Sequence, residues 1–200
     1  MPTSKTLALL LLCGAIVSCS PRDFLKRRLA ADLISASDTF RAPQIFWLRT
    51  GTVSNDEFNS PESLVLQRHG WIIGDEQKKC PPGLEPPPCW DVILSPHGVE
   101  TFQPLIHSTT PTSELVPVEV ARRELVEITG ISKAGNFADV EFTWRWVSLN
   151  EVGAALYDTG VRYRSQVGFR GYDDGWRIQT EPLRNNQPLD EALRNAQPAQ

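Results

Sequence analysis

The chain has 200 residues and a formal net charge of −4, with 40% hydrophobic and 22% charged residues. This length and apolar content suit one ordinary domain or two small ones and exclude wholesale disorder. The acidic balance argues against a nucleic-acid-binding protein, which normally carries a basic surplus. The composition also excludes a collagen-like chain, a zinc-cluster protein and a multi-span membrane protein.

The N-terminal segment has the layout of a secretory signal peptide. Lys5 supplies a positive charge, and residues 6–17 form an apolar run that is too short to span a bilayer core of about 30 Å. Residues 16–19 read Ile-Val-Ser-Cys, which resembles the bacterial lipobox of lipoprotein signal peptides. The resemblance implies that residues 1–18 are removed and that Cys19 becomes the lipidated first residue, carrying acyl chains such as palmitate. The alternative is an ordinary signal peptide with Cys19 as a chance neighbour.

Lipidation at Cys19 predicts where the protein resides. Two or more acyl chains anchor a protein stably without any spanning helix, so we expect a lipid-anchored protein of the cell envelope. Ser20 rather than an aspartate follows Cys19. In Gram-negative bacteria this resembles lipoproteins sent to the outer membrane, where the domain would face the periplasm.

A helix is predicted over residues 20–36, with Ser20 as its cap and Pro21 at its first position. Its first turns carry a basic cluster close to the predicted lipid. This cluster either contacts anionic head groups or forms a solvated helix face. Its members are Arg22, Lys26, Arg27 and Arg28.

Two cysteines remain in the mature chain once Cys13 leaves with the leader and Cys19 takes lipid. Cys80 and Cys89 form an even pair in an oxidising compartment, which predicts a disulfide. Five prolines among the eight intervening residues exclude a helix or a central strand, so the bond would clamp a stiff loop. A metal site lacks further ligands nearby, and a redox pair lacks the C-x-x-C spacing.

Residues 44–106 predict alternating short strands and helices. Strands are expected at 44–49, 71–73 and 89–94, and helices at 60–68 and 95–106, capped by Ser60 and Ser95. The order over 60–106, with the segment Ser-Pro-His-Gly at 95–98, resembles the end of a winged-helix domain. Export and the acidic charge argue against DNA binding, so a scaffold role is expected for this part.

The C-terminal part predicts a twisted antiparallel sheet after a linker at 107–115. Residues 116–131 are expected to form one long strand or two, while 139–147 and 161–169 alternate apolar and polar side chains. A helix is expected from Ser148, which with Glu151 has capping-box spacing, and a hairpin turn at 173–175. These strands loosely resemble the closing strands of cystatin-like or nuclear-transport-factor-like sheets, over about 45 residues, and the resemblance implies no catalytic residue.

The predicted fold class is therefore α+β, with N-terminal helices, a disulfide-clamped hairpin and a C-terminal sheet that carries one short packed helix. The predicted organisation is a signal peptide at 1–18, an α/β region at 19–110, a sheet region at 111–181 and a flexible tail at 182–200. The tail is expected to keep one helical turn around 189–193.

No pattern of catalytic residues stands out. His69, His97 and His107 have no metal-binding spacing, and the chain contains no G-x-S-x-G elbow, no Walker loop and no G-x-G-x-x-G. Asp173 and Asp174 fit a structural role in a turn. We therefore expect no catalytic residue, no metal, no cofactor and no enzyme activity.

Aromatic residues are the remaining candidates for a ligand site. Trp144, Trp146, Tyr163 and Trp176 either pack a core or line a groove between sheet and helix. Arginines on the opposite strand faces either bind an acidic partner or pair with nearby carboxylates. These arginines are Arg145, Arg162, Arg164, Arg170 and Arg177.

The leading functional hypothesis is a non-catalytic binding or assembly module, held to membrane lipid by the Cys19 acyl chains and working with an envelope protein. Two alternatives are a small-ligand carrier with an aromatic-lined pocket and an unrecognised hydrolase. A closed cavity under Trp144 and Trp146 would favour the carrier, and a flat arginine-rich face would favour the assembly module.

Overall fold

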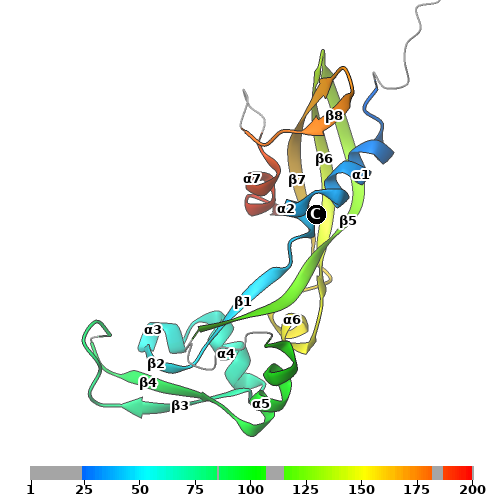
Figure 1. Ribbon diagram of the computed structural model, residues 1–200. Helices are drawn as coiled ribbons and strands as arrows, with labels where there is room; N and C mark the ends of the chain where they lie inside the picture. Colours follow the sequence, from blue (N-terminus) through cyan, green and yellow to red (C-terminus); the bar gives the residue numbers. More distant parts are fainter. Residues whose placement is uncertain (1–23, 85, 107–114, 182–186, 200) are drawn as a thin grey trace, which may run out of the picture.

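The computed structural model describes residues 24–84, 86–106, 115–181 and 187–199. Cys19, the lipobox-like segment that ends at it and His107 lie outside these residues. The fold is α+β, as predicted, and the molecule is elongated, with a sheet lobe at one end and a small lobe at the other (Figure 1). Within the described residues, no helix combines the length and the apolar character needed to cross a bilayer.

An antiparallel sheet of six strands forms the long body of the molecule. Its main path runs β1-β5-β6-β7-β8, and β9 pairs with β7. The strands are β1 (Gln44–Arg49), β5 (Leu115–Ala134), β6 (Phe137–Ser148), β7 (Arg162–Tyr172), β8 (Gly175–Ile178) and β9 (Gln197–Pro198). β5 is one continuous strand with two register shifts, and the predicted hairpin joins β7 to β8 through Asp173 and Asp174.

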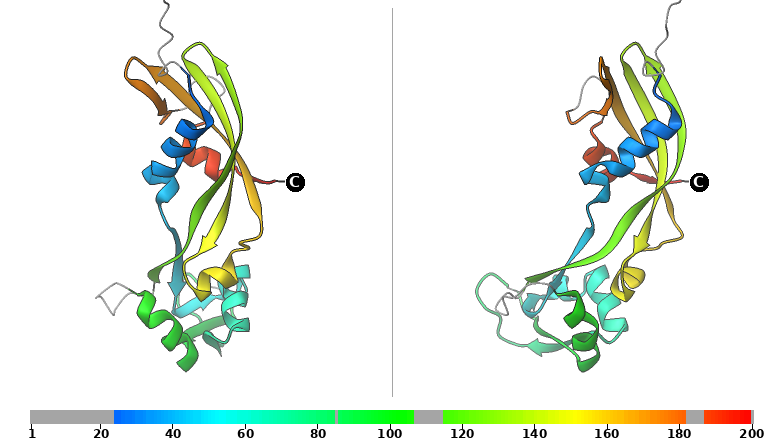
Figure 2. Two further views of the ribbon diagram at one scale, coloured as in Figure 1. Left: turned by 90° about the vertical axis from the view of Figure 1, so that its right-hand side faces the viewer. Right: turned by 45° about the vertical axis from the view of Figure 1, so that its right-hand side comes forward.

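Three helices cover one face of this sheet: α1 (Arg27–Ala36), α2 (Asp38–Arg41) and α7 (Leu189–Arg194) (Figure 2). Their buried side chains meet those of β6 and β7 in one hydrophobic cluster. The cluster includes Ala30, Ile34, Phe40, Phe142, Trp144, Val167, Phe169 and Leu193. The helix predicted from Ser20 begins only at Arg27 in the described residues, because Leu25 enters the core from a non-helical segment.

The small lobe consists of a second sheet and short helices around a separate hydrophobic cluster. The sheet has the order β2-β4-β3, with β2 (Gly51–Ser54), β3 (Ile72–Gln77) and β4 (Cys89–Leu94). The helices are α3 (Asn55–Phe58), α4 (Pro61–Arg68), α5 (Pro96–Phe102), the 3-10 turn η2 (Gln103–Leu105) and α6 (Glu151–Leu156). The predicted caps Ser60 and Ser95 are confirmed, since each hydroxyl accepts a backbone N–H three residues on.

The predicted disulfide between Cys80 and Cys89 is present, with a Cα–Cα distance of 5.7 Å. Cys89 starts β4 and is fully buried, so the bond attaches the proline-rich loop to the sheet of the small lobe.

Helix α6 forms where it was expected, but Ser148 does not cap it. Ser148 ends β6 and pairs with Ala121, so its backbone is committed to the sheet. Asn150 caps the helix instead: its Oδ1 accepts the Gly153 N–H at 2.9 Å, and its Nδ2 donates to the Glu119 carbonyl at 2.7 Å.

The C-terminal segment corrects the expectation of a flexible tail for the part that is described. The helical turn is confirmed as α7, but Leu189 and Leu193 are buried in the main core, and β9 adds to the edge of β7. The two clusters also cross the expected boundary at residue 110. α1 and α2 pack with the large sheet, whereas α6 packs with the small lobe.

Candidate functional site

The structure brings together three of the four aromatic residues that the sequence singled out. Trp144 and Trp146 are only 2% and 9% exposed, and Tyr163 stacks on Trp144 with ring centroids 4.8 Å apart. Trp144 Nε1 donates to the Ser165 hydroxyl at 3.0 Å. Trp176 lies apart, because its partner Gly171 is eight residues along β7 from Tyr163, roughly 26 Å of strand.

The space beside this aromatic cluster is occupied by the protein's own side chains. The Arg123 guanidinium lies over the Trp146 ring at 4.9 Å from its centroid and donates to the carbonyl oxygens of Thr39 and Ala42. Burial lowers the pKa of Arg123 from its ordinary value. Tyr157 packs against Trp146 at a centroid distance of 5.2 Å. These contacts make the cluster part of the core of the sheet lobe.

Two of the arginines on the opposite faces of these strands pair with carboxylates, and a third contacts an aromatic ring. Arg145 pairs with Glu124 at 3.1 Å, Arg177 pairs with Asp174, and Arg170 stacks on the ring of Tyr172. Exposed pairs of this kind contribute little to stability, but they reduce the positive charge that this face offers to a partner.

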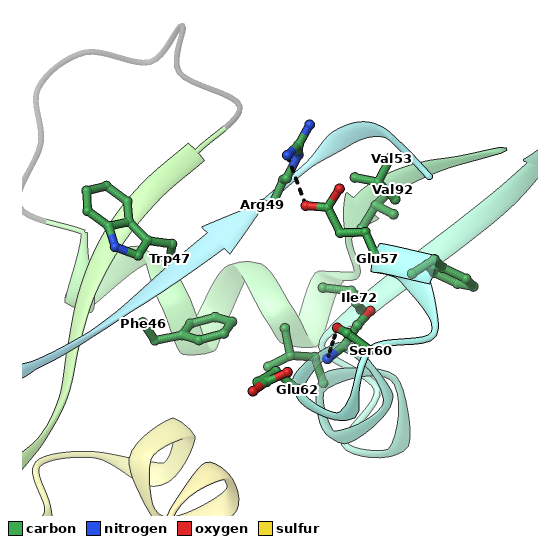
Figure 3. Close-up of a pocket in the computed structure, with 12 residues that line it drawn as sticks. Phe46, Trp47, Arg49, Val53, Glu57, Ser60, Glu62, Ile72 and Val92 are labelled. Atoms are coloured by element: carbon green, nitrogen blue, oxygen red, sulfur yellow. Dashed lines mark hydrogen bonds and ion pairs between the residues drawn. The ribbon is translucent and has the colours of Figure 1, made fainter. Parts of the chain in front are cut away.

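A groove of about 270 Å³ in the small lobe is the strongest candidate for a binding site (Figure 3). It lies between β1 on one side and α3 and α4 on the other, and we call it the β1 groove. Its apolar lining consists of Phe46, Val53, Phe58, Leu66, Ile72 and Val92. Its polar lining consists of Arg49, Glu57, Ser60, Glu62 and Ser63, and Trp47 stands at its rim.

Strand β1 forms the first wall, and its alternation explains the position of the groove. Phe46 and Leu48 point toward the core, whereas Trp47 and Arg49 point outward. Side chains from both faces of β1 nevertheless line the groove, so the groove follows an edge of the strand. β5 occupies the other edge, and among the described strands β1 is the last one of its sheet. Trp47 is 55% exposed there.

Helices α3 and α4 form the opposite wall, and short-range contacts hold them in place. Gln67 Nε2 donates to the Phe58 carbonyl at 2.7 Å, which ties α4 to the end of α3. The Phe58 ring stacks on Trp90 at 4.3 Å and crosses Gly74, where a Cβ atom would lie 2.4 Å from that ring. Glycine at position 74 therefore permits the close approach of the Phe58 ring, which lines the groove.

One ion pair bridges the groove. Arg49 Nη1 lies 3.0 Å from Glu57 Oε1, so it links β1 to α3 across the opening (Figure 3). Both side chains are half-exposed, and such a pair contributes at most about 1 kcal/mol. Glu62 adds a second carboxylate on α4. Two carboxylates and one guanidinium leave the rim net acidic.

The β1 groove has an apolar floor and a charged rim, an arrangement that suits the binding of an apolar group with a polar or basic neighbour. The described histidines lie elsewhere: His69 stacks on Trp71 at 4.5 Å, and His97 is exposed on α5. Throughout the described ranges, no three His, Cys, Asp or Glu residues gather closely enough to hold a metal ion.

The sequence predicts residues 44–49 only as a strand, and the groove was not predicted. A signal was present, because adjacent Phe46 and Trp47 in a strand must point to opposite faces, so one large aromatic ring faces away from the core.

Comparison of the chain with protein-family models, with curated proteins and with solved structures found no match.

Proposed function

We propose that this protein is a lipid-anchored, non-catalytic binding protein of the cell envelope, and that the β1 groove is where an envelope partner docks. The lipobox-like segment ending at Cys19 supports the anchor, and the disulfide agrees with an oxidising compartment. In a Gram-negative cell the Ser20 signal favours the outer membrane, facing the periplasm.

A single observation carries the assignment of the binding site. An exposed tryptophan, Trp47, stands at the rim of an apolar groove along the edge of a strand. Exposed tryptophans beside pockets are favoured anchors of protein interfaces, since they bury a large area on binding. The acidic rim favours a partner segment that carries a basic residue next to its apolar one.

Site-specific photo-crosslinking in intact cells tests this proposal. A photoreactive phenylalanine analogue at position 47 should give a discrete cross-linked product, and Ser63→Phe, which fills the groove from α4, should abolish it. The matched control is the same analogue at Ile93, which is 56% exposed on β4 of the same lobe and should give no such product. Equal products from both positions, or a product that persists in Ser63→Phe, would exclude the groove as the docking site.

The anchor has its own test. Intact mass of the membrane fraction should show an acylated Cys19, and Cys19→Ala should release an unmodified chain from the membrane. A soluble wild-type protein of unmodified mass would overturn the anchoring, whatever the crosslinking shows.

The volume of the groove supports a second candidate, a small-ligand carrier. About 270 Å³ is close to the lower limit of ligand pockets. Native mass spectrometry of the purified protein would then show a retained small molecule that Ser63→Phe releases, and no cross-linked protein would form at position 47.

A further inference from the structure

We propose that the end of the sheet lobe where the described chain begins, at Phe24, rests on the anionic surface of the membrane and holds the molecule upright, with the small lobe pointing away. This inference rests on the anchoring through Cys19. It adds an interaction surface that the anchor alone does not imply. We call this surface the anchor-side tip and define it by Phe24, Lys26, Arg28, Leu29, Lys133 and Tyr172.

Side-chain and backbone contacts join the tip from separate parts of the chain. Lys133, near the end of β5, lies over the Phe24 ring at 5.1 Å and over the Trp176 ring of β8 at 5.2 Å. The Gly171 N–H of β7 donates to the Asn136 carbonyl in the β5–β6 turn at 2.7 Å. Figure 1 shows the start of α1, the β5–β6 turn and the β7–β8 turn at the same end of the molecule.

The tip exposes apolar and aromatic side chains that its own fold does not bury. Phe24 is 54% exposed, and Tyr172 and Leu29 are also exposed. Phe24 and Leu29 line a shallow hollow together with Lys26 and Arg28. Aromatic and basic side chains in this mixture are those that proteins place at membrane interfaces, where rings reach the head groups and cations meet anionic lipid.

The charge of the tip differs in sign from that of the whole chain, which carries −4. Exposed Lys26, Arg27, Arg28, Lys133 and Arg177 outnumber the nearby exposed Asp32, Asp173 and Asp174. An anionic surface attracts such a cluster within about a Debye length, roughly 8–10 Å.

The chain between Cys19 and the anchor-side tip is short enough to hold the tip against the surface of the membrane. Phe24 lies five residue steps from the acylated position, a reach of at most about 18 Å. The small lobe lies at the other end of β5, a strand of 20 residues that spans roughly 65 Å when straight. An upright molecule therefore holds the β1 groove tens of ångströms above the lipid.

Lysines lie at both ends of the molecule, so their reactivity reports which end is covered by lipid. Among the described residues, Lys26 and Lys133 lie at the anchor-side tip, whereas Lys78 and Lys79 lie at the end of β3 in the small lobe, and all four are exposed. The chain from Cys19 to Gln200 is coupled through the Cys19 thiol to a maleimide lipid in vesicles, with Cys80 and Cys89 kept in their disulfide. Amine acetylation rates are then read by mass spectrometry.

On vesicles of phosphatidylcholine mixed with phosphatidylglycerol, the acetylation of Lys26 and Lys133 should slow several-fold, while Lys78 and Lys79 react as in free protein. Replacing phosphatidylglycerol by phosphatidylcholine should weaken the protection. Lys26→Glu with Arg28→Glu should remove the protection of Lys133, whereas the matched reversal Arg162→Glu with Arg164→Glu, on β7, should leave it intact.

Two results would overturn the upright contact. Protection of all four lysines would mean that the molecule lies flat, and protection of none would mean that the tip does not touch the lipid. Because the chemical tether replaces cellular acylation, a failure of the anchor in cells and a failure of this contact give separate readouts.

Discussion

Gly153 in α6 provides the sharpest test of how the small lobe is attached to the long strands. A Cβ atom at this position would lie 1.8 Å from the Val120 carbonyl oxygen and 2.7 Å from its carbon. The glycine therefore allows the backbone of α6 to lie directly against the backbone of β5. Gly153→Ala removes that possibility, although alanine is normally the better helix former.

The loss of stability expected for Gly153→Ala follows from the displacement of α6 away from β5. In an unhindered helix, alanine in place of glycine stabilises by about 1 kcal/mol. Here the helix must retreat, which disturbs its Asn150 cap and the Leu149 N–H···O contact with Val120 at 2.9 Å. Overpacking costs about 1–3 kcal/mol and a lost hydrogen bond about 1 kcal/mol, so after the gain in helix propensity we expect a net loss of about 1–3 kcal/mol.

Urea unfolding followed by tryptophan fluorescence measures this free energy, with the midpoint falling at an unchanged slope. The matched control is Ala154→Gly, one residue further along α6, where the side chain is exposed and only helix propensity changes. It should cost about 1 kcal/mol. A neutral or stabilising Gly153→Ala would refute the close packing of α6 on β5.

Three further predictions concern the rest of the fold. Cys80→Ser should lower the free energy of unfolding by about 2.5 kcal/mol, the chain-entropy value for so short a ring. Reductant should lower the urea midpoint of the wild type to that of the variant and leave the midpoint of the variant unchanged. Ser165→Ala should cost about 1–3 kcal/mol because Trp144 Nε1 loses its buried acceptor, while the exposed Ser132→Ala should leave the urea midpoint unchanged. Burial raises the pKa of Tyr157 above 10.0, so the folded state keeps this proton after the unfolded state has released it. The free energy of unfolding should therefore fall as the pH rises above about 10, and it should fall more steeply in the wild type than in Tyr157→Phe. Equal slopes of the free energy of unfolding against pH in the two proteins would contradict the burial of Tyr157.

Features set by neighbouring residues could be predicted from the sequence. Ser60 and Ser95 each precede a proline, and each caps a helix with its hydroxyl, because capping depends only on the first helical turn. The alternation of β6 likewise identified its buried face, from Val140 to Trp146. The disulfide was predicted from the number of cysteines and the expectation of export.

Features set by distant pairing could not be predicted. The β1 groove requires β1 to pair with β5, about seventy residues along the chain, and nothing within residues 44–49 specifies that partner. The helical turn around Leu189 and Leu193 was predicted, but the polar composition of the last residues hid the burial of these leucines, because their core exists only once β7 is in place. The site was missed for the same reason, since its two walls come from separate segments.

The long strand β5 connects the proposed anchor to the proposed site mechanically. Val118 and Val120 belong to the core of the small lobe, while Ala121 and Ile128 belong to the core of the sheet lobe. No flexible linker lies between these residues, and β5 pairs with β1 at one end and with β6 along most of its length. Under the proposed anchoring, the height of the β1 groove above the lipid is therefore set by hydrogen-bonded strand, at about 3.3 Å per residue, rather than by loop entropy. A rigid spacer of this kind serves a binding protein that must meet its partner at a fixed distance from the membrane.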